Sequence, residues 1–186
     1  MFNEFFYSGS GGVTPPQPSS NTTRSLRFNS GDSSYLQQIS SSGGNRKTWT
    51  WSGWVKRSAL GAIKSGVFGV EGTNALIRFN NDNGGNQLRV LDTATGGYDL
   101  VTEAVFKDTS SWYHFVVALD TTQPTASDRL KLYVNGVQVT EFATASYPSQ
   151  NQELTFNTTS DYRIGVSGTG NEYFDGYLAQ IQLVDG

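Results

Sequence analysis

Residues Ser111 to Val139 read S-W-Y-H-F-V-V-A-L-D-T-T-Q-P-T-A-S-D-R-L-K-L-Y-V-N-G-V-Q-V and predict two long strands separated by a polar loop. In the second strand the apolar residues Leu130, Leu132 and Val134 alternate with charged and polar ones. Because successive side chains of a strand point to opposite faces, this pattern indicates a strand with one buried face. The stretch therefore predicts a sheet that packs one face on a core and turns the other to water.

The pair Asn135-Gly136 ends that strand and predicts a two-residue turn, because Asn and Gly adopt positive φ more readily than other residues. Tyr133-Val134 and Val137-Gln138 are therefore expected to pair as a tight hairpin. Further Gly- and Asn-rich turns separate strands expected at residues 24–29, 34–40, 47–57, 66–70, 74–80, 86–92, 98–105, 111–120, 129–135, 137–143, 153–156, 161–166 and 173–184. So many short strands indicate a β-sandwich or barrel. The best candidate for a helix is the short segment Ala59 to Lys64.

The composition supports one soluble all-β domain with a substantial core, since 36% of the 186 residues are hydrophobic and 16% are charged. The net charge of −3 and the thin spread of the 13 Lys and Arg residues argue against nucleic acid as a partner. With no cysteine, the fold uses neither disulfides nor thiolate metal sites. No run approaches the ~18 apolar residues that a membrane helix needs, so no membrane partner is expected.

Residues 1–20 differ in character from the rest and predict an aromatic arm on a Gly-, Ser- and Pro-rich linker, ahead of a domain at residues 21–186. The anchoring residues of this arm are Phe2, Phe5, Phe6 and Tyr7. The arm is expected to dock onto another subunit, and the alternative is a terminus that folds back on its own domain. The segment has no basic start, so it does not read as a secretory signal, and synthesis in the cytoplasm is expected.

Three blocks accompany the hairpin in a recognisable order: S-L-R-F-N-S-G-D-S-S-Y-L at 25–36, W-T-W-S-G-W-V-K-R at 49–57 and Y-F-D-G-Y-L-A-Q-I-Q-L-V-D-G at 173–186. Together they cover nearly everything from Arg24 onward, and they resemble laminin-G-like and pentraxin-like domains of the concanavalin A-like lectin/glucanase superfamily. The resemblance implies a jelly-roll sandwich of two antiparallel sheets with an extended N-terminal arm.

Alternation within these blocks predicts which side chains face the core. Leu26 and Phe28 are expected to be buried, and Trp49 and Trp51 are expected to share one face of their strand while Trp54 takes the other. In the closing strand the apolar face is expected to consist of Tyr177, Ala179, Ile181 and Leu183.

Four segments most resemble laminin-G-like domains in structural proteins of tailed bacteriophages: W-Y-H, D-T-T-Q-x-T-A-S-D-R, L-Y-V-N-G-V-Q and Y-F-D-G-Y-L-A. This resemblance implies a component of the virion, assembled in the host cytoplasm. Its expected partners are other virion proteins, capsid or tail, contacted through residues 1–20. A homo-oligomer is expected, because virion components occupy symmetric positions.

Catalytic chemistry is not expected. Related glucanases use closely spaced carboxylates of the E-x-D-x-x-E type, because retaining hydrolysis needs two carboxyls about 5 Å apart. The nearest match, Glu172 and Asp175, has opposite parity, so its side chains point to opposite faces of a strand. The single histidine, His114, is interpreted as a framework residue and not as the base of a nucleophile. The protein is therefore predicted not to be an enzyme and to require no cofactor.

Calcium is the metal to consider, because laminin-G-like and pentraxin-like domains often bind it through loop oxygens. The candidate ligands are Asp32, Asp82 and Asp120, with Asn81 and Asn83 beside them. An acidic residue that these domains often carry in the closing strand is replaced here by Ala179-Gln180, which argues against the usual site. The alternative is that the acidic residues are solvated turn residues.

A sugar offers an apolar face and a ring of hydroxyls, so a site for it needs an exposed aromatic ring beside planar polar groups. Residues near predicted loops and strand ends could form such a site: Tyr98, Tyr147, Tyr173, Asn81, Asp82 and Asn171. The alternative for each tyrosine is a rim residue that packs on its own loop.

We therefore expect a non-enzymatic virion structural protein, either a tail-fibre or tail-associated adhesin or a capsid decoration protein. Its arm would anchor it, and its lectin-like domain would bind host-surface glycans. The alternative is a free-standing carbohydrate-binding or adhesion module of a bacterial surface protein. A glycan hydrolase or lyase ranks last, because the sequence offers no catalytic cluster.

Overall fold

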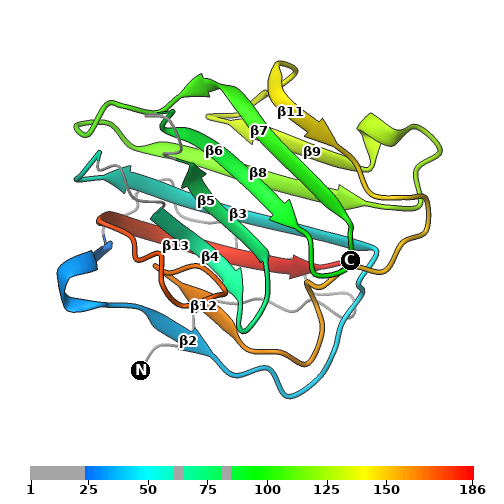
Figure 1. Ribbon diagram of the computed structural model, residues 1–186, viewed down its shortest axis with the longest axis horizontal. Coiled ribbons are helices and arrows are strands. Elements are labelled where there is room, and N and C mark those ends of the chain that lie inside the picture. The colour runs from blue at the N-terminus through cyan, green and yellow to red at the C-terminus, as the bar shows by residue number, and fades with distance from the viewer. Residues whose placement is uncertain (1–23, 61–64, 81–84) are drawn as a thin grey trace.

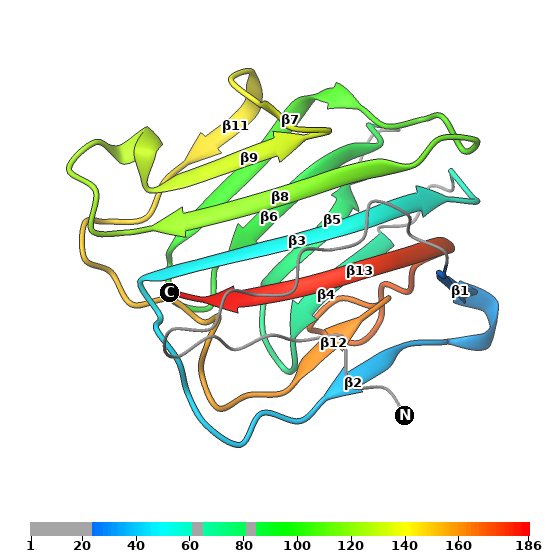
Figure 2. The ribbon, with the colours of Figure 1, turned by 180° about the vertical axis from the view of Figure 1, so that it is seen from behind.

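Residues 24–60, 65–80 and 85–186 are described by the computed structural model, and they form a sandwich of two antiparallel sheets. The six-stranded sheet faces the viewer in Figure 2, and its strands in order are β1 (Leu26–Phe28), β13 (Gly176–Asp185), β3 (Thr48–Arg57), β8 (Tyr113–Asp120), β9 (Leu130–Val134) and β10 (Val137–Gln138). The seven-stranded sheet faces the viewer in Figure 1, and its strands in order are β11 (Phe142–Ser146), β7 (Tyr98–Val105), β6 (Gln87–Asp92), β5 (Ala75–Asn80), β4 (Ser65–Val70), β12 (Tyr162–Ile164) and β2 (Leu36–Gln38).

In the described part of the chain, two short 3-10 helices connect the strands, η1 (Ser30–Asp32) and η3 (Ala126–Asp128). The prediction of an all-β jelly-roll sandwich is confirmed. Within the described part of the chain, no helix is long and apolar enough to cross a lipid bilayer. The predicted arm, with Phe2, Phe5, Phe6 and Tyr7, lies outside the described residues, and so does most of the candidate helix at 59–64.

The predicted hairpin is present. Asn135 and Gly136 have φ angles of 50° and 83°, as a two-residue turn of this type requires. This turn joins β9 to β10, which pair antiparallel with Val137 opposite Val134. Leu130 and Leu132 of β9 are buried, so the prediction that one face of this strand is buried is confirmed.

Strand β3 shows the clearest alternation, because every second side chain from Trp49 to Arg57 is buried between the sheets. The Trp49 ring packs against Phe156 with centroids 4.7 Å apart, and Trp51 packs against Phe68 at 5.9 Å. Trp54 lies on the opposite face and is only part-buried, as its position in the alternation predicted. These aromatic contacts form the centre of the core.

The closing strand β13 differs from its predicted pattern because it contains a β-bulge. Ala179 pairs with Trp54 and Gln182 pairs with Ser52, so Gln180 and Ile181 together oppose one residue of β3. The extra residue reverses the parity of the strand. Leu178 faces the core before the bulge, and Ile181 and Leu183 face it afterwards. Tyr177 was therefore wrongly assigned to the apolar face, whereas Ile181 and Leu183 were assigned correctly.

Two further boundaries differ from the prediction. The strand expected at 137–143 is two strands, because β10 ends at Gln138 and β11 begins at Phe142 in the other sheet. The segment 153–156 is not a strand. It is fixed instead by the buried carboxylate of Asp92, which accepts hydrogen bonds from the backbone nitrogen and Oγ1 of Thr155 at 2.8 and 2.9 Å. A side-chain contact between distant segments replaces the ladder that the pattern suggested.

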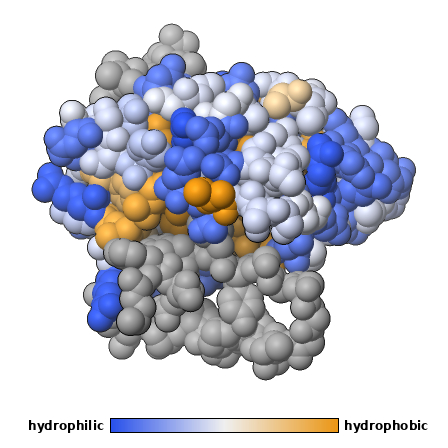
Figure 3. All heavy atoms as spheres, turned by 90° about the horizontal axis from the view of Figure 1, so that it is seen from below, coloured by the Kyte–Doolittle hydropathy of each residue, from blue (hydrophilic) through white to orange (hydrophobic). Residues whose placement is uncertain are grey.

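Strand β2 forms one edge of the seven-stranded sheet, and all its residues are exposed. The exposed large apolar side chains here are Tyr35, Leu36 and Ile39, the last with 75% of its surface accessible. Figure 3 looks at this side of the molecule and shows apolar side chains in a limited area of a largely polar surface.

Candidate functional site

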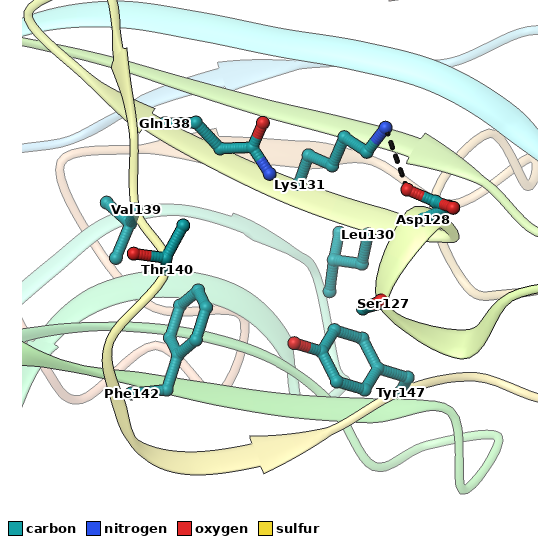
Figure 4. Close-up of a pocket in the computed structure, with 9 residues that line it drawn as sticks. All are labelled: Ser127, Asp128, Leu130, Lys131, Gln138, Val139, Thr140, Phe142 and Tyr147. Carbon is teal, nitrogen blue, oxygen red and sulfur yellow. Dashed lines mark ion pairs between the residues drawn. The ribbon is translucent and has the colours of Figure 1, made fainter.

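A hollow of about 200 Å³ lies between the hairpin β9–β10, the helix η3 and the strand β11. It is smaller than the pockets of about 300–1,000 Å³ that hold drug-sized molecules, so its size suits one small ring. We call it the β9–β11 groove, and its lining residues are Ser127, Asp128, Leu130, Lys131, Gln138, Val139, Thr140, Phe142 and Tyr147 (Figure 4).

One wall of the β9–β11 groove is aromatic. In Figure 4 the rings of Phe142 and Tyr147 lie along one side of the hollow, with Leu130 close to Tyr147 and the tyrosine hydroxyl directed towards Phe142. Both rings are part-buried and pack against the hydrophobic core, which fixes their orientation. Rings held in this way offer an apolar surface without first losing rotamer freedom.

The opposite wall is polar. The Lys131 ammonium lies 3.1 Å from a carboxylate oxygen of Asp128, and its hydrogen bond to Asp128 raises the pKa of the lysine. Ser127, Thr140 and Gln138 add polar side chains to the lining of the same hollow (Figure 4). The groove thus presents hydroxyl, amide, cation and carboxylate groups around one apolar surface.

Arg129 holds this region together. Its guanidinium donates hydrogen bonds to the carbonyl oxygens of Gln123, Pro124 and Pro148, at 2.8, 2.7 and 2.9 Å. It therefore joins the loop before η3 to the residue that follows Tyr147. The sequence reasoning missed this arginine, and the only signal was its place in the S-D-R run before β9.

The six candidate sugar-binding residues do not form one site. Tyr147 lines the β9–β11 groove, whereas Tyr173 lies beside Tyr35, with ring centroids 6.4 Å apart. Asn171 is exposed and accepts a hydrogen bond from Thr169 at 2.8 Å. Tyr35 adjoins β2 and Tyr147 follows β11, so the two groups lie at opposite edges of a sheet about 30 Å wide.

Tyr98 corrects the prediction, because only 3% of its surface is accessible and it belongs to the core. A buried ring cannot offer a face to a sugar. Tyr98 is the first residue of β7, and its side chain points inward, as do those of Leu100 and Thr102. Its position next to the Gly96-Gly97 turn had suggested an exposed loop residue. Asn81 and Asp82 lie outside the described residues.

The calcium candidates also do not converge. Asp32 lies just beyond Phe28, which pairs with Gly176 and so stands at the Arg57 end of β3. Asp120 pairs with Thr48 at the other end of that strand. The ten residues of β3 span about 30 Å, so the two carboxylates cannot share one ion.

Each of these carboxylates has a local role. Asp32 accepts a hydrogen bond from the Asn29 amide at 2.8 Å. Asp120 accepts hydrogen bonds from Thr122 and Gln123, which lower the pKa of its carboxyl. Among the described residues, no group of three or more His, Cys, Asp or Glu side chains could hold a metal ion. Asp82 and Asn83 lie outside that part of the chain.

The two acidic residues compared above with a glucanase pair have separate partners. Glu172 forms an ion pair with Arg78 at 2.6 Å, and both side chains are largely buried. Asp175 accepts hydrogen bonds from the backbone nitrogen and hydroxyl of Ser30. His114 packs on Trp54 with ring centroids 4.8 Å apart, as expected of a framework residue.

A family model described as the concanavalin A-like lectin/glucanases superfamily matches residues 18–186. No curated protein sequence matches the chain. Among solved structures, a heptameric SAP-like pentraxin from Limulus polyphemus has a TM-score of 0.56 at 12% identity, covering 80% of this chain and 68% of the pentraxin.

Two further structures share the fold. Domain 4 of the extracellular GH43 arabinanase AbnA from Geobacillus stearothermophilus, in complex with arabinotriose, has a TM-score of 0.53 at 21% identity, covering 76% of this chain and 62% of that one. Domains LG4-5 of the mouse laminin alpha1 chain have a TM-score of 0.53 at 10% identity, covering 80% and 38%. In both, the chain spans less than two thirds of the solved protein. At these identities the similarity concerns the fold.

Proposed function

The chain belongs to the concanavalin A-like lectin/glucanase superfamily, and on this premise we propose that it is a non-catalytic, glycan-binding structural protein of a phage virion. The β9–β11 groove is its proposed sugar site, and residues 1–20 are its proposed anchor to the capsid or tail. The observation that carries the glycan assignment is that Tyr147 and Phe142 line the same hollow as the polar side chains of Ser127, Gln138 and Thr140.

This arrangement suits a sugar because a pyranose or furanose ring has an apolar face and polar edges. The two aromatic rings would contact the apolar face, and the hydroxyl and amide groups would bond the ring hydroxyls. The hollow of about 200 Å³ limits the contact to one sugar unit, so weak binding by a single copy is expected. Several copies on one particle would raise the overall affinity by multivalency. The arabinotriose complex of AbnA domain 4 is compatible with this class of ligand for the fold.

The test of the groove compares the effects on glycan affinity of substituting Tyr147 and Tyr173, two tyrosines that the sequence alone does not distinguish. Glycans that bind the full chain in an array screen would be titrated by calorimetry against Tyr147→Ala and the matched control Tyr173→Ala. We expect at least a tenfold weaker affinity, about 1.4 kcal/mol, for Tyr147→Ala and little change for the control. Loss of binding by the control alone would move the site to the opposite edge of the sandwich. Failure of the wild-type chain to bind any glycan would overturn the glycan assignment.

The virion assignment is supported by the resemblance of the W-Y-H, L-Y-V-N-G-V-Q and Y-F-D-G-Y-L-A segments to phage structural proteins. Its test is immunogold labelling of this protein on purified particles. Particles that carry the full chain would be compared with particles that carry a variant in which Phe2, Phe5, Phe6 and Tyr7 are replaced by serine. Label that the variant loses, while it still folds, would support an arm-anchored component. Particles without label would favour the alternative, an adhesion module of a bacterial surface protein.

A further inference from the structure

A second surface, far from the β9–β11 groove, combines cations with aromatic rings on the outer face of the six-stranded sheet. Arg27 of β1 pairs with Tyr177 of β13, and Tyr177 pairs with Lys56 of β3. Val55 pairs with Tyr113, the first residue of β8, so Trp112, which directly precedes β8, stands next to Lys56. We call these four residues, Arg27, Tyr177, Lys56 and Trp112, the basic–aromatic row.

The row faces away from the core. Its sequence neighbours Phe28, Leu178 and Val55 are each buried between the sheets, so the adjacent side chains point outward. Arg27 is exposed, and the other three members are part-exposed. The β13 bulge creates this arrangement, because without its parity change Tyr177 and Ile181 would share one face.

The rings of the row approach each other. The ring centroids of Trp112 and Tyr177 are 6.5 Å apart, although Lys56 and its strand separate the two residues. Trp54 lies two residues before Lys56 on the same face, and its ring packs on His114 at 4.8 Å. Trp54, His114, Trp112 and Tyr177 therefore share one face of the sheet with Lys56 at this end.

Neither Arg27 nor Lys56 forms an ion pair with a described residue. Asp32, Asp175 and Asp108 lie near Arg27, Tyr177 and Trp112 in the sequence, and each accepts local hydrogen bonds: Asp32 from Asn29, Asp175 from Ser30, and Asp108 from Ser110 and Ser111. Cations that have no ion-pair partner among the described residues, beside aromatic residues on the same face of a sheet, favour a ligand that carries both negative charge and apolar faces.

We propose that the basic–aromatic row binds an acidic oligosaccharide, whose sugar rings stack on Trp112, Tyr177 and Trp54 while its anionic groups bond Arg27 and Lys56. These two cations stand two strands apart, about 10 Å. That spacing suits charges on alternate sugar units. Lys131 of the β9–β11 groove pairs with Ala118 and so stands level with Thr50, whereas Lys56 of the row stands at the opposite end of β3. The row is therefore a separate site and does not depend on the sugar assigned to the groove.

The experiment uses the full chain and two forms of one probe, a galacturonic acid hexasaccharide and its neutral methyl ester, titrated by tryptophan fluorescence. Trp54 and Trp112 are part-exposed whereas Trp49 and Trp51 are buried, so the signal reports on the outer face. We expect the acid to bind at least about tenfold more tightly than the ester and to weaken as salt rises.

Four variants locate the site. Lys56→Gln and Arg27→Gln should each weaken binding of the acid several-fold, while Lys47→Gln, at the other end of β3, should not. Tyr147→Ala should leave this binding unchanged, which separates the result from that of the groove. Equal binding of acid and ester, or equal losses from Lys47→Gln and Lys56→Gln, would overturn the proposal. Tighter binding of a single-stranded oligonucleotide than of the acid would overturn the choice of a glycan.

Discussion

The Trp54 indole packs on the His114 imidazole across the β3–β8 pair, with ring centroids 4.8 Å apart. Trp54 and Trp51 occupy one strand, yet they face opposite sides of the sheet. One packs in the core, and the other supports a histidine at the surface. The single histidine of the chain is part-buried here, so its protonation is linked to folding.

Burial lowers the pKa of His114 from its ordinary 6.5, because the charged imidazolium loses solvation. The unfolded chain then binds a proton more readily than the folded one. Stability is therefore complete above the unfolded pKa and falls as pH drops through it. We expect a lower urea midpoint at about pH 5.5 than at about pH 7.5, and His114→Gln should reduce this difference. An identical pH dependence in wild type and variant would contradict the prediction.

Tyr98→Phe should leave the free energy of unfolding unchanged or raise it by about 1 kcal/mol. The hydroxyl is buried without a hydrogen-bond partner among the described residues, and burial raises the pKa of this phenol well above its ordinary value. Removing a buried polar group that has no partner avoids its desolvation cost. Tyr98→Ala is the control and should lose about 3–5 kcal/mol through the cavity it leaves. Urea denaturation measures both, and a clear loss in Tyr98→Phe would reveal a partner for the hydroxyl.

Gly66→Ala should destabilise the protein by about 3 kcal/mol. A Cβ at Gly66 would lie 2.1 Å from the backbone nitrogen of Ser167, and backbone cannot give way as a side-chain tip can. Gly72 is the matched control, with a φ of 72° and no atom within 4 Å of its Cβ position. Gly72→Ala should lower the free energy of unfolding by only about 1 kcal/mol, because alanine is less stable than glycine in left-handed backbone. Thermal unfolding measures both variants. An equal loss of stability in Gly66→Ala and Gly72→Ala would show that segment 165–173 can move away from β4.

Gln180→Gly should stabilise the protein by up to about 1 kcal/mol, because Gln180 has a φ of 49° at the bulge. Gln182→Gly is the control in the same strand, where Gln182 pairs regularly with Ser52. It should lose about 0.5–1 kcal/mol, since glycine costs conformational entropy in a regular strand. Urea unfolding of the two variants should therefore shift in opposite directions, and parallel shifts would contradict a strained bulge.

Local patterns in the sequence determined most of the architecture. Asn135-Gly136 specified a turn with positive φ, and the alternation of Trp49, Trp51 and Trp54 specified which face of β3 is buried. Both are short-range effects, because turn geometry and the pleat of a strand depend on neighbours in the chain. For the same reason the strand limits mostly agree within one to three residues.

Only the tertiary structure decided the rest, because it depends on contacts between distant segments. The β13 bulge exists where Gly53 leaves room for Ile181, whose Cδ1 would lie 2.4 Å from a Cβ at that glycine. The bulge, and not the alternation around it, turned Tyr177 outward to join Lys56 and Trp112. In the same way the core enclosed Tyr98, and Arg129 held Tyr147 at a hollow that no spacing in the sequence could reveal. The sequence by itself determined the sheets, whereas long-range packing decided which tyrosines reach the surface.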